Sequence, residues 1–418
     1  MNLTVLCPHF APDVAPTGEV MTSIAAELVA RGHRLHIVTA LPWYQHHDIE
    51  PGWEGQVVRH EDTEWGRITR VHPFPTDKRN IPARALAFGG FTVLAALEGA
   101  IARTRPDLVL SMSPPLTLGL AGWSVARTRR VPFVFNIQDV FPDVAVELGL
   151  LKGAKVIAAA SALERVSYRR SDAVTVLSEE LADNVRAKIT RGLAGVAAER
   201  EAAKVRVIPN FVDTSAIQPR PADNGYRDEY GLTGKRVVMY AGNVGLSQSL
   251  DLVLDAAAAM ATEPDVVFVI NGGGSARLDL MRRGAGLANL RFIDMQPKAR
   301  LPEVLAAGDL HVVPLKRGLA WSSVPSKLYS ILAAGRPIVA SVDPGTEVAR
   351  TIDRAGAGVS VPPDDPESFT KAIRRLLDDA EQRDRMGAAG RTFVEGWASP
   401  AAVAAAYDAL FSELRATR

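Results

Sequence analysis

The chain has 418 residues, of which 47% are hydrophobic and 23% charged, and its formal net charge is +1. This length predicts two or three globular domains with enough apolar material for separate cores. The near-zero charge excludes a protein that binds nucleic acid through bulk electrostatics, and the single cysteine, Cys7, excludes a disulfide framework. The first residues enter a strand-like run without a basic flank, so we expect no signal peptide and a cytoplasmic location.

Apolar runs typical of strands alternate with helical patterns through residues 1–208, which we expect to form an N-terminal domain. Such alternation predicts a parallel sheet covered by helices. The expected strands are Leu3–Pro8, Arg34–Thr39, Ile68–Val71, Leu108–Ser111, Phe133–Ile137, Ala173–Leu177 and Val205–Ile208. The expected helices are Glu19–Arg31, Arg84–Arg103, Leu116–Arg129, Lys155–Arg170 and Ser178–Arg191.

A second domain is expected over residues 209–396, after the polar linker that includes Pro209–Asp213 and Gln218–Gly234. Its expected strands are Val237–Tyr240, Val266–Asn271, Leu290–Ile293, Leu310–Val313, Pro337–Ala340 and Gly358–Val361. Its expected helices are Ser247–Ala261, Ser275–Gly284, Leu301–Ala307, Lys327–Ala334, Gly345–Asp353, Pro366–Asp379 and Glu381–Gly396, with a last helix at Ser399–Arg415. The predicted fold class is therefore α/β, with two doubly wound, Rossmann-like domains.

The apolar segment 83–102 has three possible interpretations. It is about as long as a bilayer crossing requires, roughly 20 residues, but Arg84, Glu98 and three glycines weaken that interpretation. A buried helix of the first domain is the plainest alternative. Basic residues on both sides also suit a helix that lies on an anionic membrane surface.

Three loops that follow predicted strands are candidates for phosphate or nucleoside binding. Ala241–Gly245 contains Gly242 and Gly245 and precedes the helix expected from Ser247, whose free N–H groups would attract an anion. Val324–Lys327 offers Ser326 as a helix cap and Lys327 as a cation. Asn271–Gly274 would pass closely by a ribose or a base. Each loop has a plainer alternative, a steric turn or a solvated side chain. A nicotinamide-binding glycine motif and a phosphate-binding lysine loop are absent.

Several ordered segments of this chain resemble the family 4 glycosyltransferases, which are retaining enzymes of the GT-B fold. They are Phe10–Pro12 through Gly18, Arg31–His33, Thr175–Ser178, Pro209–Asp213, Phe268–Gly273, Ala307–Pro314 and Ala333–Ala340. The resemblance implies two domains with a cleft between them, and a final segment, residues 397–418, that returns to the first domain. It implies transfer of a sugar from a nucleoside-diphosphate sugar, with a UDP-sugar as the first candidate, to an acceptor hydroxyl, with no bound metal or cofactor. The pattern GNVGLSQSLD with SVPSK is similar to a branch associated with colanic-acid and O-antigen sugars, including aminodeoxyhexose transferases.

The resemblance also implies roles for particular residues. Donor diphosphate would meet Gly18, Gly242, Asn243, Gly245, Gln248, Ser326 and Lys327, and the nucleoside would meet Gly272, Gly273, Ile293 and Ser330. Lys327 and Asp139 would act in catalysis, Lys327 on the departing diphosphate and Asp139 on the sugar or acceptor. The expected partners are the donor and a lipid-linked or glycolipid acceptor in cell-envelope synthesis, with peripheral contact to an anionic membrane and no nucleic acid.

The chain departs from the family pattern at four polar positions. Asn243 and Gln248 stand where the family often has Arg and Lys, and Ser322 and Ser330 stand where it often has two glutamates. These departures keep two alternatives open: a nucleotide-sugar epimerase of the same architecture, and a non-catalytic nucleotide-sugar-binding protein. No residue spacing indicates a metal site, and His9, His33 and His36 are expected to be structural.

Overall fold

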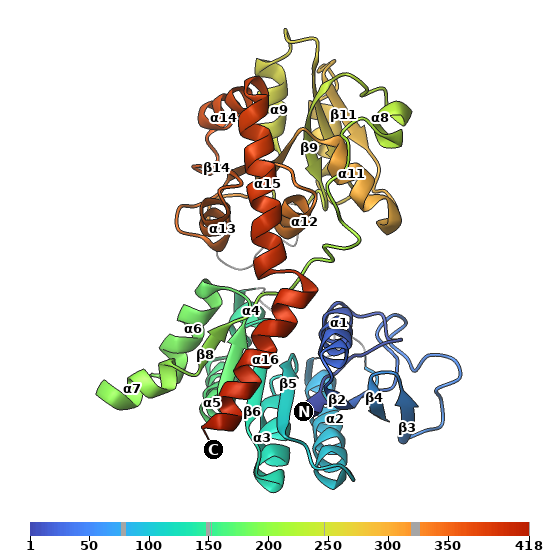
Figure 1. Cartoon of the computed structure of the whole chain (residues 1–418), viewed down its shortest axis with the longest axis vertical. Helices are drawn as coiled ribbons and strands as arrows, with labels where there is room; N and C mark the ends of the chain where they lie inside the picture. Colours follow the sequence, from blue (N-terminus) through green and yellow to red (C-terminus); the bar gives the residue numbers. More distant parts are fainter. Residues whose placement is uncertain (77–80, 148–150, 152, 246, 319–326, 418) are drawn as a thin grey trace. The chain divides into compact units, whose positions relative to one another are not determined.

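The computed structural model describes residues 1–76, 81–147, 151, 153–245, 247–318 and 327–417 (Figure 1). The described chain folds as two compact units. The first contains residues 1–210 and 403–418, and the second contains residues 211–402. Each unit is built on its own β-sheet with helices on both faces.

The first unit has an eight-stranded sheet in the order β3-β4-β2-β1-β5-β6-β7-β8. All neighbouring strands pair in parallel except β3 and β4, which form an antiparallel hairpin at one edge. The strands are β1 (Asn2–Leu6), β2 (Arg34–Ala40), β3 (Val58–Thr63), β4 (Gly66–Val71), β5 (Leu108–Ser113), β6 (Phe133–Ile137), β7 (Ala173–Val176) and β8 (Val205–Val207). The helices are α1 (Pro16–Ala30), α2 (Ile81–Ile101), α3 (Leu118–Arg129), α4 (Asp143–Glu147), α5 (Ala154–Arg170), α6 (Glu179–Ile189) and α7 (Gly195–Ala202).

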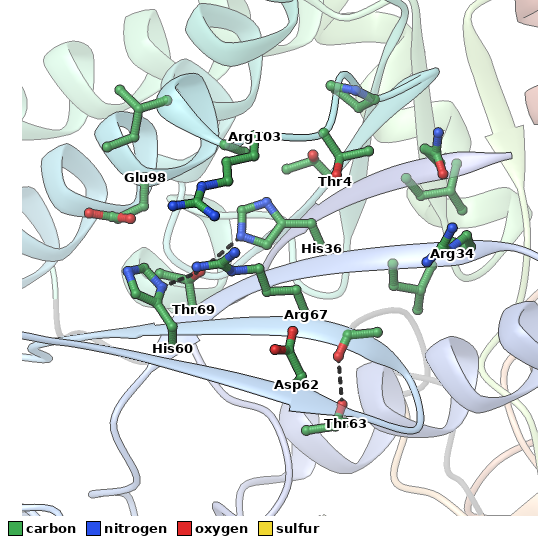
Figure 2. Close-up of a pocket in the computed structure, with 18 residues that line it drawn as sticks. Thr4, Arg34, His36, His60, Asp62, Thr63, Arg67, Thr69, Glu98 and Arg103 are labelled. Carbon is green, nitrogen blue, oxygen red and sulfur yellow. Dashed lines mark hydrogen bonds between the residues drawn. The ribbon is translucent and has the colours of Figure 1, made fainter.

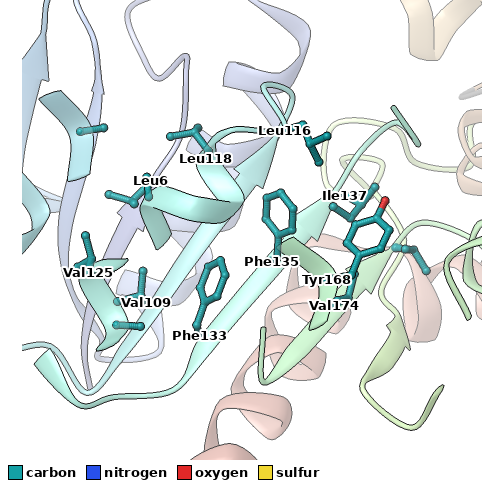
Figure 3. Close-up of a cluster of buried hydrophobic side chains, with 14 of the residues drawn as sticks. Leu6, Val109, Leu116, Leu118, Val125, Phe133, Phe135, Ile137, Tyr168 and Val174 are labelled. Atoms are coloured by element: carbon teal, nitrogen blue, oxygen red, sulfur yellow. The ribbon is translucent and has the colours of Figure 1, made fainter. Parts of the chain in front are cut away.

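The core of the first unit lies between the sheet and the helices of one face (Figure 3). Leu6, Val109 and Phe133 come from three neighbouring strands and are fully or almost fully buried. Val125 on α3 and Tyr168 on α5 complete the cluster from the helix layer. The central strands are buried along their whole length, as expected for parallel strands covered on both faces.

The second unit has a six-stranded, wholly parallel sheet in the order β11-β10-β9-β12-β13-β14. The strands are β9 (Arg236–Ala241), β10 (Val266–Asn271), β11 (Leu290–Ile293), β12 (Leu310–Pro314), β13 (Ile338–Ser341) and β14 (Gly358–Val361). The helices are α8 (Gly225–Glu229), α9 (Asp251–Ala259), α10 (Arg277–Arg283), the short 3₁₀ turn η1 (Lys298–Arg300), α11 (Leu301–Ala307), α12 (Lys327–Ala333), α13 (Glu347–Ala355), α14 (Pro366–Asp378) and α15 (Ala380–Trp397).

The last helix, α16 (Pro400–Ala416), packs on the first sheet through its residues from Val403 onward. Tyr407 is fully buried, and its hydroxyl accepts a hydrogen bond from Asn136 Nδ2 on β6 at 2.8 Å. His33, just after α1, lies 3.1 Å from the Asp408 carboxylate. The final helix is therefore part of the core of the first unit.

Both sheets reverse their strand order at one point. In the first sheet the reversal lies between β1 and β5, and in the second it lies between β9 and β12. In doubly wound sheets the crevice beyond the carboxyl ends of such strands is where ligands bind. A ligand site is therefore expected at the loops that follow β1, β9 and β12.

Candidate functional site

The loops after β9 and β10 pack against each other through their backbones. Gly242 N–H donates to the Asn271 carbonyl at 3.0 Å, and Val244 N–H donates to the Gly273 carbonyl at 2.8 Å. A Cβ on Gly272 would lie 1.9 Å from the Gly242 carbonyl oxygen, far inside van der Waals contact. Gly272 is therefore required by this loop-to-loop contact, whereas a Cβ on Gly273 would point into open space.

Lys327, the first residue of α12, lies directly over the Gly242 loop. Its Cε is 3.5 Å from the position of a Cβ on Gly242. Its Nζ donates to Tyr240 Oη at 2.8 Å and to Gln248 Oε1 at 2.9 Å, and it lies 4.2 Å from the centroid of the Tyr240 ring. Burial lowers the pKa of this amine to about 8, because no carboxylate of the described residues lies within ion-pair distance of it.

Tyr240 and Gln248 position the Lys327 amine. The Tyr240 hydroxyl donates to the Asn243 carbonyl at 2.5 Å, which leaves its lone pairs for the ammonium group. Burial raises the pKa of Tyr240, so the phenol stays protonated and neutral. The result is a partly desolvated ammonium held by two neutral acceptors, with binding capacity for an anion.

The helix expected to begin at Ser247 begins at Asp251, and this part of the prediction is wrong. Gln248 forms an isolated bridge with Leu315, and Ser249 N–H donates to the Pro314 carbonyl. These bonds hold residues 247–249 in an extended link beside the end of β12. Helix α9 therefore does not follow directly on the Gly245 turn. Asp251 lies in its first turn, so a carboxylate is already present at the positive end of the helix.

The remaining donor and nucleoside candidates are distributed along the same edge of the sheet. A Cβ on Gly245 would lie 2.8 Å from the side-chain Nδ2 of Asn243. Ile293 ends β11 and is buried, and its carbonyl accepts from Gly272 N–H at 2.9 Å. Ser330 is half-buried on α12, one turn after Lys327. Ser326 and Ser322 lie outside the described residues.

In the first unit, Asp139 directly follows β6 and is an exposed residue. Partial desolvation raises the pKa of its carboxyl group, and no described residue hydrogen-bonds to it. The neighbouring Gln138 is buried and fixed on both sides, accepting from Asn210 at 2.8 Å and donating to Asn136 at 2.7 Å. Asp143 instead pairs with Lys188 at 2.8 Å, which indicates a structural role.

The loop after β1 contains a contact between His9 and Asp13 that the sequence analysis did not identify. His9 Nδ1 lies 2.6 Å from an Asp13 carboxylate oxygen, and both side chains are almost fully buried. The other Asp13 oxygen accepts from the backbone N–H groups of Trp43 and Tyr44, which follow β2. The His9 and Asp13 spacing of four residues was a visible signal, but it fits many loops equally well.

Gly18 is not in the loop itself but in the first turn of α1, where it is buried. A Cβ there would lie 2.9 Å from His9 Cβ. Its glycine identity is therefore explained by the close approach of α1 to the His9 loop, and contact with a donor phosphate stays a prediction.

Neither a metal site nor a reactive thiol is indicated by the described part of the chain. No group of three or more His, Cys, Asp or Glu residues there is arranged to hold a metal ion. Burial raises the pKa of Cys7 to about 12, so its thiol stays protonated.

Two doubly wound units, each with loops beyond the carboxyl ends of its strands, have the architecture of the GT-B fold. Residues 17–211 match the model for the glycosyl transferase 4-like domain, and residues 224–393 match the model for glycosyl transferases group 1. The chain belongs to the family 4 glycosyltransferases, in the branch of the proteins WcaI and WbjE.

Two relatives illustrate this membership, and one solved structure shows the same fold. WcaI of Escherichia coli K12, named for colanic acid biosynthesis, is 30% identical over 389 residues, which cover 90% of this chain and 92% of WcaI. WbjE of Pseudomonas aeruginosa is 29% identical over 319 residues, which cover 74% of this chain and 75% of WbjE. The structure of Anabaena HepE in complex with UDP shares the fold, with a TM-score of 0.65 at 13% identity over 99% of this chain and 100% of HepE.

The interpretation of segment 83–102 as a membrane span finds no support. Among the helices of the described residues, none combines the length and the apolar character that crossing a bilayer requires.

Proposed function

We propose that this glycosyltransferase moves a sugar from a nucleoside-diphosphate sugar, of which a UDP-sugar is the first candidate, to a lipid-linked or glycolipid acceptor. The reaction would belong to cell-envelope polysaccharide or glycolipid synthesis. The names of WcaI, from colanic acid biosynthesis, and of the HepE complex, with UDP, support this assignment by similarity. The observation that carries it is the Lys327 ammonium, which two neutral acceptors hold beside the Gly242 loop.

The chemistry that we propose needs a cation where the diphosphate departs. As the bond between the anomeric carbon and the β-phosphate oxygen breaks, negative charge grows on that oxygen, and Lys327 stabilises it. The acceptor hydroxyl attacks the same face of the sugar, its proton passes to the departing phosphate, and the anomeric configuration is retained. No metal takes part in this scheme, and Asp139 would orient the acceptor or the sugar.

The remaining donor contacts in this proposal come from backbone and neutral side chains. The N–H groups of Asn243 and Gly245 make no hydrogen bond to another described residue, so they are available to phosphate oxygens. Gly273, where a Cβ would meet open space, offers a surface on which the nucleoside can lie. Gly242, Gln248, Ser326, Ser330, Gly18 and Ile293 complete the proposed binding set.

Thermal shifts with UDP, GDP, ADP and dTDP, followed by transfer assays with the best nucleotide's sugar donors, test this proposal. Lys327→Ala should lower turnover by roughly 100- to 1,000-fold, the range for loss of one preorganised group at a developing charge, and should change nucleoside affinity much less. Lys371→Ala, which removes an exposed lysine of α14, is the matched control. Tight donor binding without transfer to any lipid-linked acceptor, or unchanged turnover in Lys327→Ala, would contradict the proposal.

A further inference from the structure

A cavity of about 720 Å³ lies in the first unit, at the amino ends of β1, β2 and β4 (Figure 2). Its walls also include the end of α2 and the residues that follow this helix. Because β1, β2 and β4 run parallel, their carboxyl ends and the His9 loop lie about one strand length away, roughly 15 Å. The cavity is therefore separate from the ligand edge of this sheet.

Arginine side chains line this cavity without a neutralising partner. Arg67 on β4 and Arg103 after α2 point into the same part of the cavity (Figure 2), and neither forms an ion pair with a described residue. Arg59 and Arg70 of the same β3–β4 hairpin behave differently, since both pair with Glu61, at 3.0 and 3.1 Å. Two arginines of the hairpin are thus paired with Glu61, whereas Arg67 forms no ion pair with a described residue, although Asp62 is its cross-strand neighbour.

Two histidines and a hydroxyl form a fixed polar wall between these arginines. Thr69 Oγ1 lies 2.9 Å from His36 Nε2 and 3.1 Å from His60 Nδ1. Burial and then the positive charge of Arg67 lower the pKa of His36 to about 4, so this ring is neutral at pH 7. The depressed pKa is consistent with a positive potential in the cavity, which a bound anion would relieve.

Two carboxylates line the same cavity. Asp62 on β3 is directly opposite Arg67 in the β3–β4 ladder, and Glu98 lies on α2; neither forms an ion pair with a described residue. Carboxylates accept hydrogen bonds from hydroxyl groups, whereas they repel an anion. The cavity therefore combines an anion-binding part with hydroxyl-accepting parts, and its volume lies in the range of small-molecule sites, about 300–1,000 Å³.

We propose that this cavity binds a phosphate ester that carries free hydroxyl groups, with Arg67 and Arg103 on the phosphate and Asp62 and Glu98 on the hydroxyls. Guanidinium groups suit phosphate oxygens because they offer paired N–H donors. The ligand is either a soluble polyol phosphate or the phosphoglycerol headgroup of a lipid. Ile101, which lines the cavity and is exposed, connects it to the outer face of α2 and makes the second source accessible.

Glycerol 3-phosphate is the probe for this proposal, read by NMR of ¹³C-labelled histidine rings in the full-length protein. Its binding should move the His36 and His60 resonances saturably. Arg67→Gln and Arg103→Gln should each weaken the apparent affinity at least tenfold, and Arg105→Gln, on the same segment but outside the cavity, should leave it unchanged. Arg103 follows α2 and is exposed, so we expect Arg103→Gln to leave the fold intact.

Flotation with phosphatidylglycerol vesicles, compared with phosphatidylcholine vesicles, distinguishes the two sources. Vesicle binding that Arg67→Gln and Arg103→Gln abolish, and that glycerol 3-phosphate displaces, assigns the site to a lipid headgroup. Saturable binding of glycerol 3-phosphate without such vesicle binding assigns it to a soluble ester. The proposal is overturned if neither probe binds, or if both arginine variants bind them as the unmodified protein does. None of these outcomes depends on Lys327 or on sugar transfer.

Discussion

Lys327 gives the proposed site a distinctive pH dependence. Its pKa in the folded protein is about 8, below the usual 10.5, because burial disfavours the charged form. The amine is charged below pH 8 and neutral above it, and a diphosphate needs the charged form. We therefore expect kcat/KM to fall about tenfold per pH unit above pH 8, and the bound donor to raise the pKa of Lys327.

The pH profile of Lys327→Met provides the comparison. This variant should have low activity without the alkaline decline that Lys327 causes. The stability effect has the opposite sign, because between pH 8 and 10.5 the unfolded chain binds the extra proton, so folding should become more favourable as pH rises through this window. A kcat/KM that stays level to pH 9.5 in the unmodified enzyme would refute the assignment.

Gly272 and Gly273 form a natural pair for separating steric from binding roles. A Cβ on Gly272 would collide with the Gly242 carbonyl oxygen, whereas one on Gly273 would meet nothing. We expect Gly272→Ala to cost about 3 kcal/mol or more in the free energy of unfolding, as other strained backbone positions do, and Gly273→Ala to stay within about 0.5 kcal/mol.

Chemical unfolding measures the difference in stability between the two variants, and nucleotide titration measures their difference in affinity for the nucleotide. If the nucleoside lies on Gly273, the stable Gly273→Ala variant should bind the nucleotide more weakly than the unmodified protein does. Unchanged nucleotide affinity in that variant would remove Gly273 from the binding set while leaving the structural role of Gly272 intact.

At the residue level, the sequence indicated Lys327 and the glycine loops but not their contacts. A cation at the start of a helix is a local pattern, and so is a glycine turn after a strand. The contacts of Lys327 with Tyr240 and Gln248 could not be predicted, although Gln248 itself was a candidate, because they join residues that are far apart in the chain. The same holds for Asp13, whose bonds to Trp43 and Tyr44 depend on how two loops meet.

At the scale of elements, periodicity located the buried strands and most helices, and it failed where tertiary contacts set the boundary. The start of α9 moved from Ser247 to Asp251 because residues 247–249 pair with the end of β12. Strand β3 was not predicted because its residues Val58–Thr63 are mostly polar and lie at the edge of the sheet. Short helices such as α4, α7 and α8 lack the length that makes a helical period visible.

Helix α2 carries an exposed apolar stripe that bears on membrane contact. Leu86, Val93, Leu97 and Ile101 are 79%, 58%, 54% and 69% exposed, and their spacing puts them on one face of the helix. Figure 1 shows α2 on the outside of the first sheet. A stripe of this kind next to Arg103 and Arg105 fits a surface-bound helix on anionic lipid.

We expect Val93→Gln combined with Leu97→Gln to reduce binding to vesicles that contain phosphatidylglycerol at least several-fold. Because both side chains are exposed, the thermal unfolding temperature should change little. Leu278→Gln, at another exposed leucine (74%) on α10, is the matched control and should bind as the unmodified protein does. Equal flotation of the double variant and the control would exclude α2 as the lipid contact.

At the scale of the whole molecule, the two units have separate cores, although the chain passes through the second unit before it completes the first. Val403, Tyr407, Leu410 and Phe411 of α16 are buried in the first unit, although they follow α15 in sequence. No local pattern could have indicated this packing, because an amphipathic helix can pack on either sheet.

Two buried tyrosines test whether the cores unfold separately. Tyr407 is buried in the first unit against Asn136, and Tyr226 is buried in the second, where its hydroxyl donates to Asn271 at 2.8 Å. Replacing either by alanine should cost about 3–5 kcal/mol, the range for large aromatic side chains in cores. Hydrogen exchange should then increase in β6 and β7 for Tyr407→Ala, and in β9 and β10 for Tyr226→Ala.

The reciprocal pattern is decisive, because a single cooperative core would raise exchange in both sheets for either variant, whereas separate cores confine each effect to one sheet. Since α16 follows the second unit in the chain, confinement of the Tyr407→Ala effect to β6 and β7 would further imply that the first sheet reaches full stability only after the second unit has been made.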